Sequence, residues 1–594
     1  MLNYYSKKLV KRSLQGSKKI IGKNKKLKKI STQVKNVLFT ENPHALYDYT
    51  RYSPSISDYL KQQKKQKAFK IKPLISIVMP TYNTPIEFLE YCIQSVIDQS
   101  YTNWELCIAD DASTNSDVEK ILSKYSKIDS RIKYIIRKNN GHISAATNSA
   151  IEMANGEYVS LLDHDDILWP NALFEIVSVI NKNTALDLIY TDEDKIDESN
   201  KIHSYPFFKP SWSPEFLESC NYITHFSTIR RSLLLKVGCF RIGFEGAQDW
   251  DLFIRISEVT NNISHIPKIL YSWRIHSNST AMDTDAKPYV YNAQRKLLEE
   301  HIVRSGQSAV VKRGIIKQHS CIEYDLVEKP LVSIICSNEN SKSFKNRIKS
   351  LVKRTTYSNF EFIIITNTDN DYKRCSKNMH NIENVKVVHV ANLKKSDNFD
   401  QAIKQANGKY FIYIDTNIVV ESNDWIETLL SDSQRKNVGA VSGKVVNKTK
   451  DRFMSAGYAT GIYGLYAPLL EGMAVGDVHY MRGLYGQSRR NVSALDGCIM
   501  FSKEVYKVSG GFTYNLNDTF IVDFCLKLLD KGYRNVYNPF ATFIDTDNRY
   551  AGEIDKLRDK NEEILFKRKW NKYIENDPFL NPNFTKTNSQ LEIN

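Results

Sequence analysis

The sequence predicts an α/β protein in which one kind of domain occurs twice, each copy built on a parallel sheet. Short apolar runs rich in β-branched residues alternate with segments long enough for helices, as is typical of repeated β–α units. Acidic residues follow several of these runs. Segments of the first half also recur, in the same order, in the second half.

Acidic residues end most apolar runs of the first half, in WELCIADD (104–111), YVSLLDHDD (158–166) and LIYTDED (188–194). Ligands of parallel α/β sheets collect at the carboxyl ends of the strands. The chain has no Gly-rich phosphate loop, so these acids favour a bound cation that holds phosphates. We therefore expect nucleotide-diphosphate chemistry at this edge.

The duplication is visible in two long pairs of segments. PLISIVMPTYN (73–83) recurs as PLVSIICSNEN (330–340), and ANGEYVSLLDHDD (154–166) recurs as ANGKYFIYIDTNI (406–418). Segments that begin at 103 and 238 recur in the same way at 359 and 510. The expected organisation is a basic arm and linker (1–70), a first domain (71–325), a second domain (328–560) and a polar tail (561–594).

The second copy keeps scaffold residues and loses chemically active ones. The retained pairs are Gly156 with Gly408, Asp163 with Asp415, and Asp251 with Asp523. The altered pairs are Asp111 with Asn367, Asp165 with Asn417, Asp249 with Ile521, and His276 with Asn548. We expect the second domain to keep the fold without the metal and the base.

The net charge of +15 is concentrated at one end of the 594 residues. Residues 1–35 hold twelve Lys or Arg and no Asp or Glu, and subtracting these twelve leaves +3 for the rest. Apolar residues lie between the lysines, so we predict a basic helical arm on an anionic inner membrane surface. The alternatives are a solvated tail and nucleic-acid contact. The body is nearly neutral, and we expect no nucleic-acid partner for the protein.

Cysteine content and hydropathy bear on location. Nine cysteines without a CxxC pair indicate reduced thiols. No apolar run nears the roughly 18 residues that span a bilayer, and the N-terminus lacks the apolar stretch of a secretory signal. We expect a cytoplasmic protein that is peripheral at the inner face of the plasma membrane.

The acids of LLDHDD follow a strand of buried type. Carboxylates at a strand end can hold Mg²⁺ or Mn²⁺ and leave positions for phosphate oxygens and water. The alternative is a loop of solvated acids, with Asp166 near the cap of the next helix.

Asp110 and Asp111 end the second predicted strand ahead of a turn. A carboxylate there can accept the imide N–H of uracil or thymine, and Pro80, Tyr82 and Asn83 would line the same pocket. The alternative is hydrogen bonding within a βα turn.

Asp249 opens a predicted amphipathic helix, where backbone N–H groups stabilise an anion. The position suits a cap, and it also suits a general base that deprotonates an alcohol. His276 precedes a Ser/Asn loop, where it is either structural or a ligand.

Seven motifs, in order, carry a resemblance to a known family: PTYN (80–83), ADDAS (109–113), GHISAATNSAI (141–151), ANGEY–LLDHDD (154–166), YTDED (190–194), EGAQDWDL (245–252) and WRIHSNST (273–280). The set resembles glycosyltransferase family 2, and more narrowly its tandem-domain members of O-antigen and capsular polysaccharide synthesis. The resemblance implies two GT-A (Rossmann-like) domains, a nucleotide-sugar donor, Mn²⁺ or Mg²⁺, and inversion at the anomeric carbon.

The resemblance also implies roles for individual residues. The nucleotide sugar would contact Pro80, Tyr82, Asn83, Asp110, Asp111, Asn148 and Asp163. The metal would be held by Asp163, Asp165 and His276. Asp249 would be the base, and the acceptor side would include Glu245, Gln248 and Trp250. Gln248 replaces the Glu of the family motif, and Thr147 stands where many members carry Arg.

The predicted function is an inverting glycosyltransferase of bacterial surface polysaccharide synthesis. It would move a sugar from a UDP- or dTDP-sugar to a glycan or lipid-linked acceptor. The alternatives are a bifunctional polymerase with two active domains and a non-catalytic scaffold of the same pathway. A nucleotidyltransferase would share the metal and nucleotide but would have no use for a base at Asp249.

Overall fold

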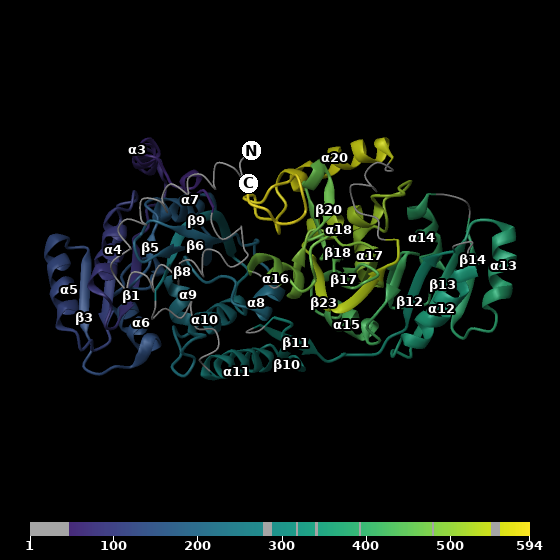
Figure 1. Ribbon diagram of the computed structural model, residues 1–594, viewed down its shortest axis with the longest axis horizontal. Helices are drawn as coiled ribbons and strands as arrows, with labels where there is room; N and C mark the ends of the chain where they lie inside the picture. Colours follow the sequence, from purple (N-terminus) through teal and green to yellow (C-terminus); the bar gives the residue numbers. More distant parts are fainter. Residues whose placement is uncertain are drawn as a thin grey trace, which may run out of the picture.

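The computed structural model describes residues 47–276, 288–316, 319–338, 342–390, 394–477, 480–547 and 559–594. Residues 1–35, expected to form the basic arm, lie outside these ranges, as does Asn548. Figure 1 shows two lobes side by side along the longest axis of the molecule.

The first lobe is built on a nine-stranded sheet with the order β3-β2-β1-β4-β8-β6-β9-β5, and β7 pairs with β6. The strands are β1 (Ile75–Thr81), β2 (Trp104–Asp110), β3 (Ile132–Ile136), β4 (Tyr158–Leu161), β5 (Ile167–Leu168), β6 (Leu188–Asp197), β7 (His203–Phe207), β8 (Ser227–Arg230) and β9 (Ile263–Ile275). The helices are α3 (Ile56–Lys65), α4 (Ile86–Ile97), α5 (Ser116–Ile128), α6 (His142–Met153), α7 (Ala172–Lys182), α8 (Pro214–Ser219), α9 (Arg231–Lys236), α10 (Gln248–Ser257) and α11 (Pro288–Arg304). A hairpin of β10 (Ala309–Arg313) and β11 (Ser320–Tyr324) follows.

The second lobe repeats this plan in a ten-stranded sheet with the order β14-β13-β12-β15-β22-β17-β23-β16; in addition, β18 pairs with β17 and β21 pairs with β23. Its strands are β12 (Val332–Ser337), β13 (Phe360–Thr366), β14 (Val385–His389), β15 (Tyr410–Ile414), β16 (Ile418–Val420), β17 (Val438–Val446), β18 (Phe453–Ser455), β21 (Arg490–Val492), β22 (Cys498–Ser502) and β23 (Arg534–Asp545), with a separate pair β19 (Tyr458–Thr460) and β20 (Tyr466–Pro468). Its helices are α12 (Lys342–Arg354), α13 (Asp369–Met379), α14 (Lys395–Lys404), α15 (Trp425–Ser433), α16 (Tyr480–Gln487), α17 (Lys503–Ser509), α18 (Phe520–Asp530) and α20 (Lys560–Glu575).

Both sheets are mixed, which corrects the expectation of a parallel sheet. Strands β1 to β4 are parallel, whereas β8 enters antiparallel between β4 and β6. In the second sheet β22 occupies the same place with the same direction. The shared strand order therefore confirms one α/β plan used twice, although one central strand runs against its neighbours.

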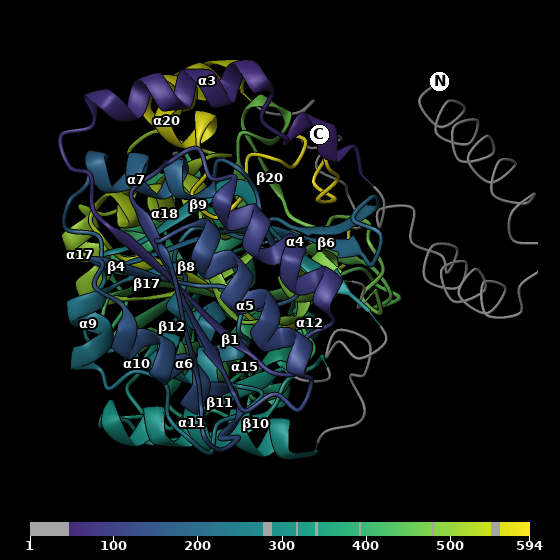
Figure 2. The same cartoon turned by 90° about the vertical axis from the view of Figure 1, so that its left-hand side faces the viewer.

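Alternate residues of β1 face opposite layers, as the period of two in a strand requires. Ile75, Ile77 and Met79 pack in a core with apolar residues of α4, α5 and α7, whereas Val78 packs in the other core with residues of α6 and α10. Figure 2, which looks at the first lobe end-on, shows α4 and α5 in front with α3 across the top. Both faces of the sheet are thus covered, so polar side chains that can reach a ligand lie at the ends of its strands.

A glycine that occurs in both lobes fits one close backbone approach. A Cβ on Gly156 would lie 2.6 Å from Ser76 Oγ, and one on Gly408 would lie 2.5 Å from Ser333 Oγ. In each lobe the serine hydroxyl accepts a hydrogen bond from the glycine N–H, at 2.7 and 2.9 Å. The duplicated ANG motifs therefore serve the same packing role.

The C-terminal residues, expected as a polar tail, form α20 and then a partly buried segment. Phe566 and Trp570 of α20 are buried. Beyond α20, Asn581 Nδ2 donates to Asp192 Oδ2 of β6 at 2.9 Å, and Ser211 N donates to Pro578 O at 3.0 Å. The end of the chain therefore returns to the first lobe.

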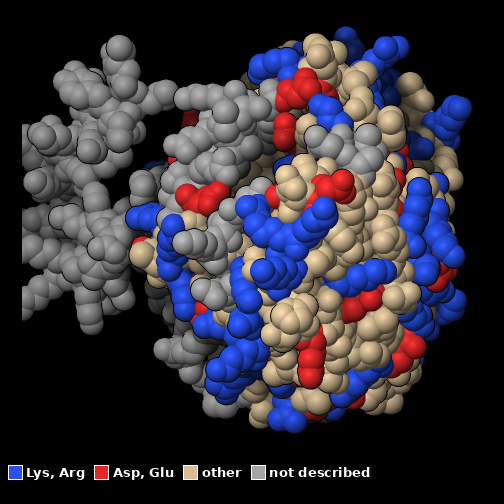
Figure 3. All heavy atoms as spheres, turned by 90° about the vertical axis from the view of Figure 1, so that its right-hand side faces the viewer, with Lys and Arg blue, Asp and Glu red and all other residues tan. Residues whose placement is uncertain are grey.

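Surface charge is uneven over the described residues. Figure 3 shows Lys and Arg gathered on the outer end of the second lobe, where α12 contains six basic residues and no acidic one. All nine cysteines are unpaired thiols, as predicted. Within the described ranges, no helix has the length and apolar character needed to cross a bilayer.

Candidate active site

Two carboxylates and one imidazole meet at the carboxyl end of β4. Asp163, Asp166 and His225 place one possible ligand atom each within 4.8 Å of the others. His225 Nε2 lies 3.8 Å from Asp163 Oδ2, and the Asp163 side chain is 39% exposed. Among the described residues, this is the cluster whose composition and spacing could hold a metal ion.

Asp166 forms the buried floor of this cluster. Tyr271 OH donates to its Oδ2, and the backbone N–H of Arg274 donates to its Oδ1 at 2.7 Å. Burial raises the pKa of Asp166 well above its ordinary value, and the charges of Asp165 and Asp163 add to the shift. Both oxygens of Asp166 are thus already engaged by protein donors.

Asp165 and His276 form a separate pair beside the cluster. His276 Nε2 lies 2.8 Å from Asp165 Oδ2. Burial would raise the pKa of Asp165, but His164 and His276 outweigh it and lower the pKa. The structure therefore brings two of the three expected metal residues together, and it places His225, not His276, next to Asp163.

Asp249 is the second residue of α10 and faces the same cluster. Asn221 Nδ2 donates to its Oδ2 at 2.7 Å, and Trp250 N donates to its Oδ1 at 2.8 Å. Burial raises the pKa of Asp249; the charge of His225 opposes the shift and that of Asp163 adds to it. The predicted base therefore lies within electrostatic range of the acidic cluster.

Buried charges hold the loop that carries Asn221 and His225. Glu193 of β6 accepts from His225 N at 2.9 Å, and Lys209 Nζ donates to Glu193 Oε2 at 3.0 Å and to Ile223 O at 2.6 Å. Sequence analysis missed both loop residues, because NYITHF has no recognisable ligand spacing. The YTDED motif was the one sequence signal for this loop, because its Glu193 accepts the hydrogen bond from His225 N.

The acids of YTDED do not follow their strand, as the sequence suggested, but lie inside it. Asp192, Glu193 and Asp194 are buried within β6. His265 Nε2 lies 2.7 Å from Asp192 Oδ1, and His203 contacts Asp194. Because buried partners compensate the carboxylates, the strand continues through them.

The residues expected around the nucleobase lie at the ends of β1 and β2. Asp111 is buried, accepts from Gly141 N at 3.0 Å and pairs with Arg137. Asp110 accepts from Ser113 N at 2.9 Å, which is the turn pattern considered as its alternative.

Pro80, Tyr82 and Asn83 form the facing side of this region. Pro80 is buried in β1, whereas Tyr82 is 45% exposed and so available for stacking. Asn83 has φ 49° and its Oδ1 accepts from Thr114 N at 2.9 Å, which ties the two βα loops together.

Two of the expected contact residues form hydrogen bonds with the backbone. Both ends of the Asn148 amide bind the backbone of Phe240, at 2.8 and 3.0 Å. Trp250 is buried, and its Nε1 donates to Leu217 O at 2.7 Å. These bonds occupy the polar groups of both side chains, and the donor contact of Asn148 and the acceptor contact of Trp250 stay predictions.

Glu245 and Gln248 lie in the turn that leads into α10. Glu245 Oε2 accepts from Gly243 N at 3.0 Å, and Gln248 Oε1 accepts from Gly246 N at 2.7 Å. Both remain partly accessible beside Asp249.

In the second lobe, the described residues paired with Asp249 and Asp165 have other side chains. Ile521 is buried in α18, and Asn417 Nδ2 donates to Asp545 Oδ1 at 3.0 Å. Asp415 is paired with Tyr413, and burial raises its pKa.

Comparison with known proteins identifies the family. A family model described as "Glycosyl transferase family 2" matches residues 76–238 and again residues 331–475, together more than half of the chain. The chain belongs to glycosyl transferase family 2. The paired matches, one in each lobe, confirm the tandem arrangement of family-2 domains predicted from the sequence.

Several relatives of this family-2 chain are longer proteins. It is 35% identical over 534 residues to the uncharacterized protein y4gI of Sinorhizobium fredii, covering 86% of this chain and 57% of that one. It is 32% identical over 446 residues to the O-antigen biosynthesis protein RfbC of Myxococcus xanthus, covering 74% of this chain and 35% of that one. A chondroitin synthase of Escherichia coli is 32% identical over 225 residues, 38% of this chain and 32% of the synthase. The chain thus spans little more than half the length of the first relative and about a third of the others.

Solved structures similar to this family-2 chain include TarS 1–349 of S. aureus in complex with UDP-GlcNAc. The match has 20% identity and a TM-score of 0.33, and it covers 39% of this chain and 66% of that one.

Proposed function

We propose that the chain is an inverting glycosyltransferase whose active site lies at the carboxyl edge of the first sheet. One observation carries the proposal. Asp249, with a raised pKa, shares a site with the acids that follow β4. A base beside a cluster of carboxylates suits transfer from a diphosphate leaving group to a hydroxyl.

The donor groups at this site fit a hard divalent cation. Carboxylate oxygens predominate there, as Mg²⁺ and Mn²⁺ prefer. In line with the family resemblance, we keep Asp163, Asp165 and His276 as the residues that would hold the ion. A bound cation would stabilise negative charge on the departing diphosphate.

In the proposed reaction, Asp249 accepts the proton of an acceptor hydroxyl as that oxygen attacks C1 of the donor sugar. The bond from C1 to the diphosphate oxygen breaks, and the nucleoside diphosphate leaves with the bonding electrons. Attack opposite the leaving group inverts the anomeric centre. Asn221 keeps the Asp249 carboxylate oriented throughout by its 2.7 Å hydrogen bond.

For substrates we propose a UDP- or dTDP-sugar donor and a glycan or lipid-linked acceptor of bacterial surface polysaccharide. Asp111 and the exposed Tyr82 would contact the nucleobase. The names of two relatives, an O-antigen biosynthesis protein and a chondroitin synthase, support polysaccharide as the product class. We propose that the second lobe does not transfer sugar, because Ile521 replaces the base.

A donor screen with product analysis tests the proposal. Binding at 100 times the dissociation constant should stabilise the fold by about 2.7 kcal/mol, which a thermal shift detects. With an acceptor and Mn²⁺, a nucleoside diphosphate should be released. Release of pyrophosphate would instead indicate a nucleotidyltransferase, and no binding of any nucleotide sugar would favour a scaffold.

We also propose that residues 1–35 hold the protein on the anionic inner face of the plasma membrane. Deleting them should abolish sedimentation with anionic vesicles without lowering the rate on a soluble acceptor, and added salt should mimic the deletion. Equal sedimentation of the full-length and truncated proteins would contradict this.

A further inference from the structure

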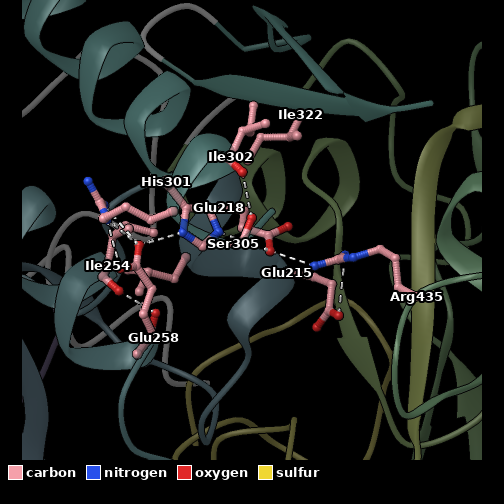
Figure 4. A network of polar contacts seen from close by, with 12 residues as sticks. Glu215, Glu218, Ile254, Glu258, His301, Ile302, Ser305, Ile322 and Arg435 are labelled. Atoms are coloured by element: carbon pink, nitrogen blue, oxygen red, sulfur yellow. Dashed lines mark hydrogen bonds and ion pairs between the residues drawn. The ribbon is translucent and has the colours of Figure 1, made fainter. Parts of the chain in front are cut away.

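A buried ion-pair network joins the two lobes at α8, directly ahead of the loop that carries Asn221 and His225 (Figure 4). Glu215 and Glu218 of α8 are both buried. In the second lobe, Arg435 Nη2 lies 2.5 Å from Glu218 Oε1 and Arg489 Nη2 lies 2.5 Å from Glu218 Oε2. Arg534 Nε lies 3.0 Å from Glu215 Oε1. The first lobe thus supplies the acids of the junction and the second lobe supplies the arginines.

Uncharged contacts reinforce the same short helix. Ser213 Oγ, the N-cap of α8, accepts from Asn491 N of the second lobe at 3.0 Å. At the other end of α8, Ser219 Oγ donates to Arg489 O at 3.2 Å. Both ends of α8 are therefore fixed by the second lobe.

From α8 the chain runs directly to the predicted base. Asn221 follows the last residue of α8 by two positions and donates to Asp249. Trp250, next to Asp249, donates from Nε1 to Leu217 O in the middle of α8 at 2.7 Å. A displacement of α8 would thus reach Asp249 by two routes.

We propose that the second lobe positions the catalytic base of the first. Its arginines, through Glu218 and Glu215, hold α8 and the loop that follows so that Asn221 orients the Asp249 carboxylate. Glu218 and Asn221 are positioning residues, since both act through Asp249 and neither accepts the proton itself. The inference rests on the proposed transferase function, and it gives the lobe without a base a role in the chemistry.

The test compares Glu218→Gln with Glu562→Gln. Glu562 is also buried, and it holds a loop inside the second lobe, where its oxygens accept from Asn517 N at 2.6 Å and Asp518 N at 3.0 Å. Glu218→Gln should lower kcat by about tenfold or more while KM and the calorimetric affinity for the donor stay unchanged. Glu562→Gln should leave kcat unchanged. Equal losses of kcat in the two variants would overturn the proposal.

A double-mutant cycle tests the route through Asn221. Asn221→Ala should lower kcat without weakening donor binding. Adding Glu218→Gln to it should cost little more, because both changes disturb the same carboxylate. If the fold losses of kcat in the two single variants multiply in the double variant, the two residues act independently, and the route through Asn221 is contradicted. If Glu218→Gln does not fold, Ser213→Ala removes the acceptor of Asn491 N and replaces it in the cycle.

Hydrogen exchange provides a readout that does not need turnover. Backbone amides of residues 220–226 should exchange faster in Glu218→Gln than in the unmodified protein, and Glu562→Gln should not change them. Unchanged exchange would overturn the positioning role, whatever the activity. Lack of transfer by the unmodified protein would count against the proposed function instead, so the two failures are distinguishable.

Discussion

At the scale of single residues, the oxygens of Asp249 each accept one hydrogen bond, from Asn221 and from the backbone of Trp250. Burial and the nearby Asp163 raise its pKa, so the carboxylate binds a proton more readily than an exposed aspartate does. The hydrogen bonds fix its direction, while burial increases its basicity. These are the two properties that a general base needs.

The metal residues can be separated by substitution. Asp165→Ala should weaken Mn²⁺-dependent donor binding by about tenfold or more, because it removes an oxygen ligand of a hard cation. His276→Ala should weaken it less. His225→Ala is the matched control, since His225 contacts Asp163 but is not an expected ligand.

Calorimetry with donor, with and without EDTA, measures these affinities. If His225→Ala removes the metal dependence while Asp165→Ala keeps it, the cluster of Asp163, Asp166 and His225 holds the ion instead.

At the scale of elements, His301 of α11 contacts both α8 and the residue that caps the C-terminal end of α10. His301 Nδ1 of α11 lies 2.8 Å from Glu258 Oε1, and its Nε2 lies 3.9 Å from Glu218 Oε1. Burial alone would lower the pKa of His301, but the bonds with Glu218 and Glu258 outweigh it and raise the pKa to about 9. The imidazolium therefore belongs to the charged network of the lobe junction.

This raised pKa predicts how stability depends on pH. The folded protein holds the proton more tightly than the unfolded chain, so the stabilisation is complete below about pH 6.5 and is lost as pH rises through about 9. Its size is on the order of 3 kcal/mol. Denaturant unfolding across this pH range should show the loss, and His301→Gln should remove that part of the slope. An unchanged slope in the variant would contradict the assignment.

The elements differ in how far the sequence could predict them. The sequence predicted β1, β2 and β4 and their copies from short apolar runs rich in β-branched residues. It also placed Asp249 at the start of a helix, because the residues after it have an amphipathic pattern. The sequence did not predict the antiparallel direction of β8 or the position of His225 beside Asp163. Both depend on where the segment after β7 re-enters the sheet. The burial of Trp250 did not follow from the sequence either, since the motif that suggested an acceptor contact does not show which face of α10 is buried.

At the scale of the whole molecule, the two lobes share one fold, and the proposed active site lies in the first lobe alone. Asp415→Ala in the second lobe should therefore leave the transfer rate and metal binding unchanged. Selective loss of one of two sugar linkages in the product would show that this lobe is a working transferase.

Removing residues 328–594 should lower the transfer rate and the stability of the first lobe much more than Asp415→Ala does. The deletion would leave Glu215 and Glu218 without their arginine partners, and loss of one partner of a buried pair commonly costs about 3–5 kcal/mol. The second lobe thus contributes through packing and charge even where it contributes no base.

The most direct test of the central claim is the transfer rate and product stereochemistry of Asp249→Asn beside the unmodified protein, with the donor found in the screen. The unmodified protein should transfer the sugar with inversion at the anomeric carbon and release a nucleoside diphosphate. Asp249→Asn should bind the donor with unchanged affinity and transfer at least about a hundredfold more slowly, as expected when a general base is lost. Activity of Asp249→Asn within tenfold of the unmodified protein, or retention at the anomeric carbon, would contradict the account.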